Sequence, residues 1–136
     1  MKNKIYAFFL IFFFVGVIFM MIKGNNARSD LTKNGKLTIG KYVLHKRYSK
    51  SSENYFIFYL NGEICKRNGG TAPSGFSKNI GKFYKIKYLE KYNIIIDALF
   101  NEQITDTLEI LKAGFSMDEV LNIKRNNLFP PYQKME

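Results

Sequence analysis

The sequence predicts an α+β protein: an N-terminal transmembrane helix, a small antiparallel β-sheet or barrel of four to five strands, and a C-terminal helical hairpin. Three features predict this class: an uncharged apolar run near the N-terminus, strand-like segments around an Asn-Gly pair, and a helical period near the C-terminus. The expected parts are an anchor at residues 1–23, a linker at 24–36, a β-domain at 37–104, and a hairpin at 105–136 that packs on the β-domain.

The apolar run extends from Ile5 to Ile22 and contains no charged residue. A helix of this length would measure about 27 Å, close to the hydrocarbon thickness of a bilayer. The alternative is a cleavable signal peptide, whose apolar core is usually about 7 to 15 residues long and ends in a small-x-small site. This run is longer, and the nearest small residues, Gly24 and Ala27, are badly spaced for cleavage. We therefore expect an uncleaved anchor rather than a signal peptide. A buried core helix is disfavoured because the run has no polar face.

Flanking charge does not decide the orientation, because basic residues occur on both sides of the run. Lys2 and Lys4 precede it, and Lys23 and Arg28 are among those that follow it. A short N-terminal tail favours a cytoplasmic N-terminus with the domain exported. The segment Lys23–Lys36 is polar and has no apolar period, which indicates a short linker, with folded structure starting near Leu37.

The clearest local signal lies at Asn61-Gly62, which separates two strand-like runs. This pair tolerates the positive φ angles of a tight type I′ turn. The turn would place Phe58 opposite Cys65, and alternation then puts one apolar set on each face. The first set is Phe56, Phe58, Leu60 and Cys65, and the second is Tyr55, Ile57, Tyr59, Ile64 and Lys66. A strand with two apolar faces has to be covered on both sides.

Three further segments complete the predicted β-domain. Residues 37–48 are rich in β-branched and aromatic residues and form a first strand. Residues 83–89 alternate apolar residues with Lys85 and Lys87, as in a half-buried strand. A loop at 68–79 precedes that strand, and Ile94–Ile96 is the expected last strand.

The period becomes helical after Thr105. Gly114 provides a left-handed stop, and Ser116 with Glu119 forms a capping box for a second helix. Pro130 and Pro131 end that helix. Two short helices in a hairpin are predicted, and the second apolar face of the sheet offers them a surface to cover.

The chain is basic, with 21 Lys and Arg against 11 Asp and Glu. Residues 35–104 carry 12 basic and 5 acidic side chains, whereas the last 32 residues carry 4 and 5. A basic domain beside a bilayer is attracted to anionic headgroups, although such lysines also serve simply to solvate a small sheet. The candidates for contact with an anionic surface are Lys82, Lys85, Lys87, Lys46 and Arg47.

Catalytic and metal chemistry find little support in the sequence. Cys65 is the only cysteine and His45 the only histidine, too few for a four-ligand zinc site. His45 is expected at the surface, and Cys65 is expected to pack as a small apolar residue. Two glycine-rich stretches, Gly35–Tyr42 and Gly70–Ser77, each lack an essential part of a phosphate-binding loop. The acids Glu53, Glu63, Glu90 and Asp97 are scattered. We therefore expect a non-enzymatic protein without a cofactor.

The functional alternative is a module that binds polyanions or single-stranded nucleic acid. Residues 82–88 interleave lysines with aromatic rings, the combination that small-barrel proteins use to bind a phosphate backbone and stack bases. The same alternation is what a half-buried strand requires, with Tyr84 and Tyr88 turned into the core. We therefore favour the structural interpretation of this strand.

The middle of the chain resembles uncharacterised bacterial membrane-anchored small β-domain proteins over about residues 35–104. The likeness comprises Gly40 with Val43, the Asn61-Gly62 hairpin, Ile80-Gly81-Lys82, and Lys87-Tyr88 before a turn that lacks the usual proline at Lys91-Tyr92-Asn93. It implies a small β-domain and a membrane address, and brings no known activity or functional residues.

The C-terminal segment has two further likenesses. Gly114-Phe115-Ser116 with Glu119-Val120 is similar to a helix-turn-helix segment of mercury-resistance-type regulators. The second likeness is to the short helical hairpin appended to many bacterial membrane proteins, with one residue fewer between the glycine and the acid. The positions that roughly follow it are Leu108, Leu111, Gly114, Glu119, Lys124 and Leu128. A plain helical hairpin explains both, because the segment is nearly neutral, which disfavours DNA contact.

Together these observations predict a single-pass protein of the bacterial inner membrane with its β-domain exported. It would act as a non-catalytic envelope or interaction module, whose partner is another protein or the anionic lipid headgroups, with nucleic acid the less favoured partner.

Overall fold

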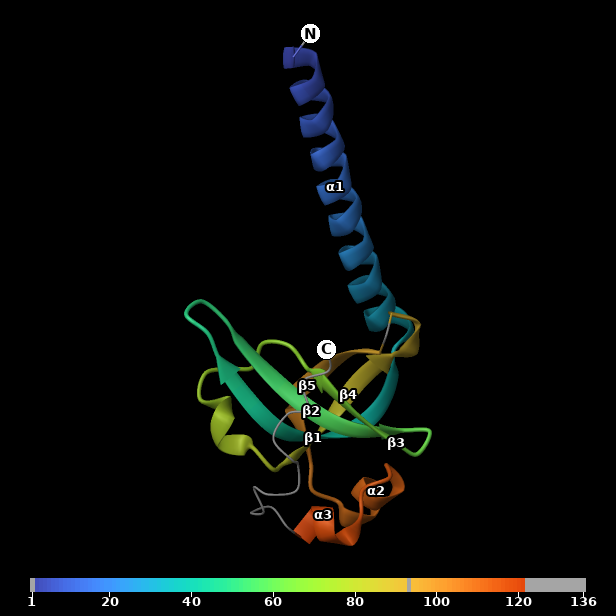
Figure 1. Cartoon of the computed structure of the whole chain (residues 1–136). Coiled ribbons are helices and arrows are strands. Elements are labelled where there is room, and N and C mark those ends of the chain that lie inside the picture. Colours follow the sequence, from blue (N-terminus) through green and yellow to red (C-terminus); the bar gives the residue numbers. More distant parts are fainter. Residues whose placement is uncertain (1, 93, 122–136) are drawn as a thin grey trace.

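The computed structural model describes residues 2–92 and 94–121, with side chains at 5–91 and 94–121. The elements in chain order are α1 (Lys2–Asn34), β1 (Lys36–Arg47), β2 (Ser52–Leu60), β3 (Glu63–Asn68), a 3-10 turn (Phe76–Asn79), β4 (Phe83–Leu89), a second 3-10 turn (Glu90–Tyr92), β5 (Ile95–Ile104), α2 (Thr107–Lys112) and α3 (Met117–Leu121). The long α1 projects from one side of the sheet, and α2 and α3 lie on the opposite side (Figure 1). The predicted α+β class is confirmed.

The five strands form one antiparallel sheet in the order β3-β2-β1-β4-β5. The predicted hairpin register is confirmed, since Leu60 faces Glu63 and Phe58 faces Cys65. Asn61 and Gly62 have φ angles of 52° and 83°, as the tight turn requires.

The alternative of a barrel is wrong, because the curled sheet does not close. Within the described residues, its two edge strands are linked by a backbone hydrogen bond from Ala98 N to Gly69 O (3.0 Å) rather than by a ladder. The physical reason is that β3 has only six residues and ends at Asn68, before it could pair along β5.

The concave face of the sheet holds an aromatic core. The rings of Phe56 and Phe76 lie 5.1 Å and 5.2 Å from the ring of Tyr42, and Tyr84 lies 5.0 Å from Phe76. Ile86 is fully buried beside them. Aromatic pairs at these separations add to the stabilisation from burial alone. Phe76 comes from the loop at 68–79, so this loop closes the open side of the curl.

The other face of the sheet is covered by α2 and α3, as expected. Ile110 and Phe115 pack on Ile39, Ile57 and Phe83. Gly114 has a φ of 103°, and the Ser116 hydroxyl and Glu119 carboxylate cap each other's backbone N–H at 3.2 Å and 2.7 Å. The stop and the capping box are therefore confirmed. The prolines predicted to end the second helix lie outside the described residues.

Two expected boundaries differ from the structure. The last strand is β5 (Ile95–Ile104), much longer than Ile94–Ile96, because its polar end pairs with β4, with Gln103 opposite Tyr84 and Ile104 opposite Phe83. The expected linker at 24–36 is helical as far as Asn34. Contacts with the sheet, described below, stabilise this polar segment, and they are invisible in its sequence.

Replacement of Gly69 by alanine is expected to destabilise the domain. The added Cβ would lie 2.7 Å from Phe56 Cδ2 and 2.8 Å from Ala98 Cβ, too close for a packed core. We expect a loss of about 1–3 kcal/mol in the free energy of unfolding, measured by denaturant titration in mild detergent. Gly24→Ala is the control, because its Cβ meets nothing within 4 Å. Equal stability of both variants would contradict this packing.

Candidate functional site

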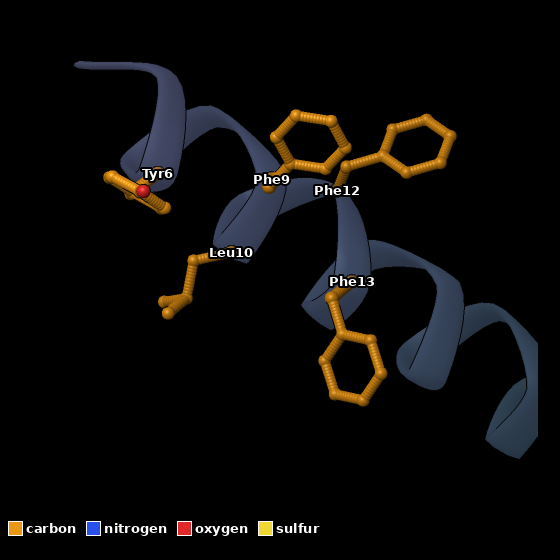
Figure 2. A pocket seen from close by; sticks show the side chains of 5 residues that line it. All are labelled: Tyr6, Phe9, Leu10, Phe12 and Phe13. Atoms are coloured by element: carbon orange, nitrogen blue, oxygen red, sulfur yellow. The ribbon is translucent and has the colours of Figure 1, made fainter. Parts of the chain in front are cut away.

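The N-terminal half of α1 exposes an apolar surface on all sides. Its large side chains have exposed fractions from 38% at Val17 to 78% at Met20. Figure 2 shows Phe9 and Phe12 projecting from one side of the helix and Leu10 and Phe13 from the other, and with Tyr6 these side chains line an open apolar pocket. Within the described residues, α1 is the one helix long and apolar enough to cross a membrane.

The last turns of α1 dock on the sheet. Leu31 is buried, and the Lys87 ammonium on β4 donates to the carbonyl of Thr32 (3.1 Å) near the helix C-terminus, where the helix dipole favours a cation. Lys91 forms an ion pair with Asp30 at 3.2 Å. Gly35 lets the chain turn into β1, since a Cβ there would lie 2.3 Å from Leu31 O. The apolar helix is thus joined to the sheet through a packed junction.

The structure does not gather the five predicted basic residues into one patch. Lys85 pairs with Glu102 (3.2 Å) and Lys87 caps α1, so both take part in structural contacts. Lys82, before β4, donates to Asn79 (2.8 Å). At the far end of β1, Lys46 lies 5.5 Å from the Tyr55 ring and Arg47 is exposed. The turn between β1 and β2, which follows this pair, points to the same side of the sheet as α1 (Figure 1).

Lys41 is a structural cation that was not predicted from the sequence. Its ammonium donates to the carbonyl of Glu119 on α3 (2.7 Å) and lies 5.4 Å from the Phe83 ring. Burial lowers the pKa of Lys41, and the nearby Glu119 carboxylate opposes that shift. The Tyr59 hydroxyl donates to the Glu119 carboxylate at 3.0 Å. Burial raises the pKa of Tyr59, and the bond to Glu119 raises it further. These contacts hold α3 against the sheet.

A buried polar network centres on Asn54, which is fully buried. Its Oδ1 accepts a hydrogen bond from the Tyr42 hydroxyl (2.8 Å) and lies 2.9 Å from His45 Nδ1, while its Nδ2 donates to Gly70 O (2.9 Å). The Asn68 side chain accepts from Asn54 N (3.3 Å). His45 is therefore half-buried and bonded, not the solvated residue that was expected. Asn54 was missed, although counting back in twos from Phe58 places it on the inner face.

This network holds the loop after β3. Hydrogen bonds with Tyr42, Asn68 and Gly70 satisfy the buried groups of Asn54. Cys65 is half-buried and packs against the aromatic core, in the predicted place opposite Phe58. In the described part of the chain, no three His, Cys, Asp or Glu side chains come together as metal ligands.

Comparison of this chain with protein-family models, with curated proteins and with solved structures finds no match. The likenesses noted in the sequence therefore stay predictions. The function has to be argued from this chain's own geometry.

The stability of the domain is expected to fall as the pH rises from about 10 to 12. Burial, with a smaller contribution from Tyr84, raises the pKa of Tyr42 to about 12. A tyrosine in the unfolded chain ionises near pH 10, so the unfolded chain loses this proton at a lower pH than the folded domain does. Between about pH 10 and pH 12 a rise in pH therefore favours the unfolded chain, and below about pH 10 the ionisation of Tyr42 does not change the stability.

Urea titrations of the full chain between pH 9 and pH 12 test this expectation. Tyr42→Phe should show a shallower fall, although it starts from a lower stability because it loses the bond to Asn54. Tyr48→Phe, at a half-exposed side chain, should follow the parent. Parallel curves for the parent and Tyr42→Phe would refute the assignment.

Proposed function

We propose that this chain is a single-pass membrane protein whose α+β domain is a non-catalytic interaction module held at the bilayer surface. One observation carries the proposal: an 18-residue window of α1 is apolar, and none of it is buried against the rest of the chain. The hydrocarbon core of a bilayer is a solvent that matches such a surface.

Energetics support lipid as the surroundings of this helix. Six phenylalanines lie between Ile5 and Ile22. Leaving one such ring in water, instead of burying it, costs about 1.5–3 kcal/mol of free energy. In water the total penalty would be on the order of 10 kcal/mol, comparable to the stability of a whole domain. An oligomer in water could also cover this surface, and extraction experiments distinguish the two.

The packed junction supports the role of a module held close to the surface. A flexible linker would let the domain diffuse away from the bilayer, whereas here α1 continues to Asn34 and docks on β4. The domain then presents a defined side to the membrane. This arrangement fits a protein that meets its partner at the surface, either another protein or lipid headgroups.

Single-stranded nucleic acid is a weaker candidate partner. Tyr84 is 2% exposed and Tyr88 packs on Phe58 with ring centroids 6.1 Å apart, so neither ring is free to stack on a base. Base stacking is the main source of affinity in such modules besides backbone charge. The lysines of this strand alone would give only weak, salt-sensitive binding.

Carbonate extraction of the full chain tests anchoring. We expect the protein to stay in the membrane pellet at its full, uncleaved mass. Replacing Phe12 and Phe13 by arginine should release it, because each charge near the helix centre costs about 2.5–3.5 kcal/mol on insertion. The matched variant with leucine at both positions should stay in the pellet. A soluble parent protein, or one lacking its first 23 residues, would refute the proposal.

A C-terminal reporter tests which side the domain occupies. We expect a fused alkaline phosphatase, which needs an oxidising compartment for its disulfides, to be active in a bacterial host. A fluorescent protein that folds only in the cytoplasm should be dark at the same site. The reverse pattern would place the domain inside and would contradict an exported module.

A further inference from the structure

A groove of about 550 Å³ lies between the last turns of α1 and the two edge strands of the curled sheet, β3 and β5. Three segments far apart in the sequence build it: α1, the end of β3, and the start of β5. Its lining residues are Gly24, Ala27, Arg28, Leu31, Arg67, Asn68, Ile94, Ile95 and Ile96.

Among the described residues that line the groove, the ionisable side chains are Arg28 and Arg67, both of them positive. The nearest acid along α1, Asp30, is engaged by Lys91 at 3.2 Å. The groove thus draws one arginine from each of two separate elements, and arginine binds phosphate through paired N–H donors.

The sheet holds Arg67 in a fixed orientation. Its Nε donates to Ile94 O (3.2 Å) and its Nη1 donates to Lys66 O (2.9 Å). These two bonds orient the guanidinium plane, and further N–H donors of its five remain for a ligand. A preorganised arginine loses less conformational entropy on binding than a free one.

The groove begins at the depth of the lipid headgroups. Gly24 and Arg28 follow the end of the apolar run at Ile22 by two and six residues, which is about 3 Å and 9 Å along the helix. The headgroup layer on each side of the hydrocarbon is about 5–7 Å thick. Helical side chains lean toward the N-terminus, so the Arg28 side chain extends back from its Cα toward that layer.

The shape and polarity of the groove fit a lipid better than a free ion. Gly24 and Ala27 leave room along α1, and a Cβ at Gly24 would meet nothing within 4 Å. Leu31 and the Ile94–Ile96 segment supply apolar walls next to the two arginines. An anionic phospholipid carries both a phosphate for the arginines and a glycerol ester region for the walls.

We propose that this groove binds the headgroup of an anionic phospholipid, with Arg28 and Arg67 contacting its phosphate. The proposal rests on the membrane anchoring proposed above, and it names one ligand for the surface module. Neither arginine belongs to the five basic residues that were predicted from the sequence to contact an anionic surface.

Native mass spectrometry of the full chain in detergent, titrated with phosphatidylglycerol or phosphatidylcholine of equal acyl length, tests the proposal. The first phosphatidylglycerol should bind at least about tenfold more tightly. Arg28→Gln and Arg67→Gln should each weaken it about tenfold, or about 1.4 kcal/mol, and leave phosphatidylcholine binding unchanged. Ala27→Leu should weaken phosphatidylglycerol binding with all charges in place, because it fills the groove.

Arg47→Gln is the matched control, with the same charge change at an exposed arginine outside the groove. Equal binding of the two lipids, or an equal loss in Arg47→Gln, would overturn the groove site. Displacement of the lipid by millimolar inorganic phosphate would assign the groove to a free anion and overturn it also. Carbonate extraction of every variant separates the two proposals: retention in the pellet with no lipid preference refutes only this one.

Discussion

The sheet of this protein is apolar on both faces, and most of the domain follows from the need to cover both. On one face, curling brings Tyr42, Phe56 and Tyr84 together, and Phe76 from a loop closes the open side. On the other face, Ile39, Ile57 and Phe83 receive Ile110 and Phe115 from the C-terminal helices. A half-covered sheet of this composition would leave several large aromatic rings in water, at a cost of about 1.5–3 kcal/mol each. The short helices α2 and α3, too short to be stable alone, exist because the second face provides their core.

The junction between α1 and the sheet turns a membrane helix into part of the domain. Leu31 supplies the buried contact, Gly35 allows the close turn into β1, and Lys87 caps the helix end. Each contact is modest, and exposed ion pairs such as Lys91 with Asp30 contribute about 0–1 kcal/mol. Together they give the domain a defined orientation relative to the helix axis. The same docking creates the groove beside Arg28 and Arg67, so the proposed anchoring and the proposed lipid site share one structural origin.

The basic residues of this chain have two roles: some hold the fold together, and others face solvent or the groove. A count of basic residues does not tell these roles apart. Lys41, Lys85 and Lys87 each contact a carbonyl or a carboxylate of another element and help to hold the fold. Arg47 is exposed, whereas Arg28 and Arg67 meet at a groove. The alternating lysines of β4 are visible in the sequence, and Lys85 and Lys87 were among the five basic residues predicted for an anionic surface. The arginine pair is not visible there, since 39 positions separate Arg28 from Arg67 and only the docking of α1 brings them to one groove.

Features that depend on near neighbours are readable from the sequence: the uncharged helix, the Asn61-Gly62 hairpin with its register, and the Gly114 stop with its Ser116 and Glu119 caps. Local backbone preferences and periodicity specify these without any distant contact. Long-range contacts set the length of β5, the helical state of residues 24–34, the open edge of the sheet and the burial of Asn54 and His45. These depend on backbone pairing and packing between segments far apart in the chain, and such contacts leave no periodic trace in the sequence.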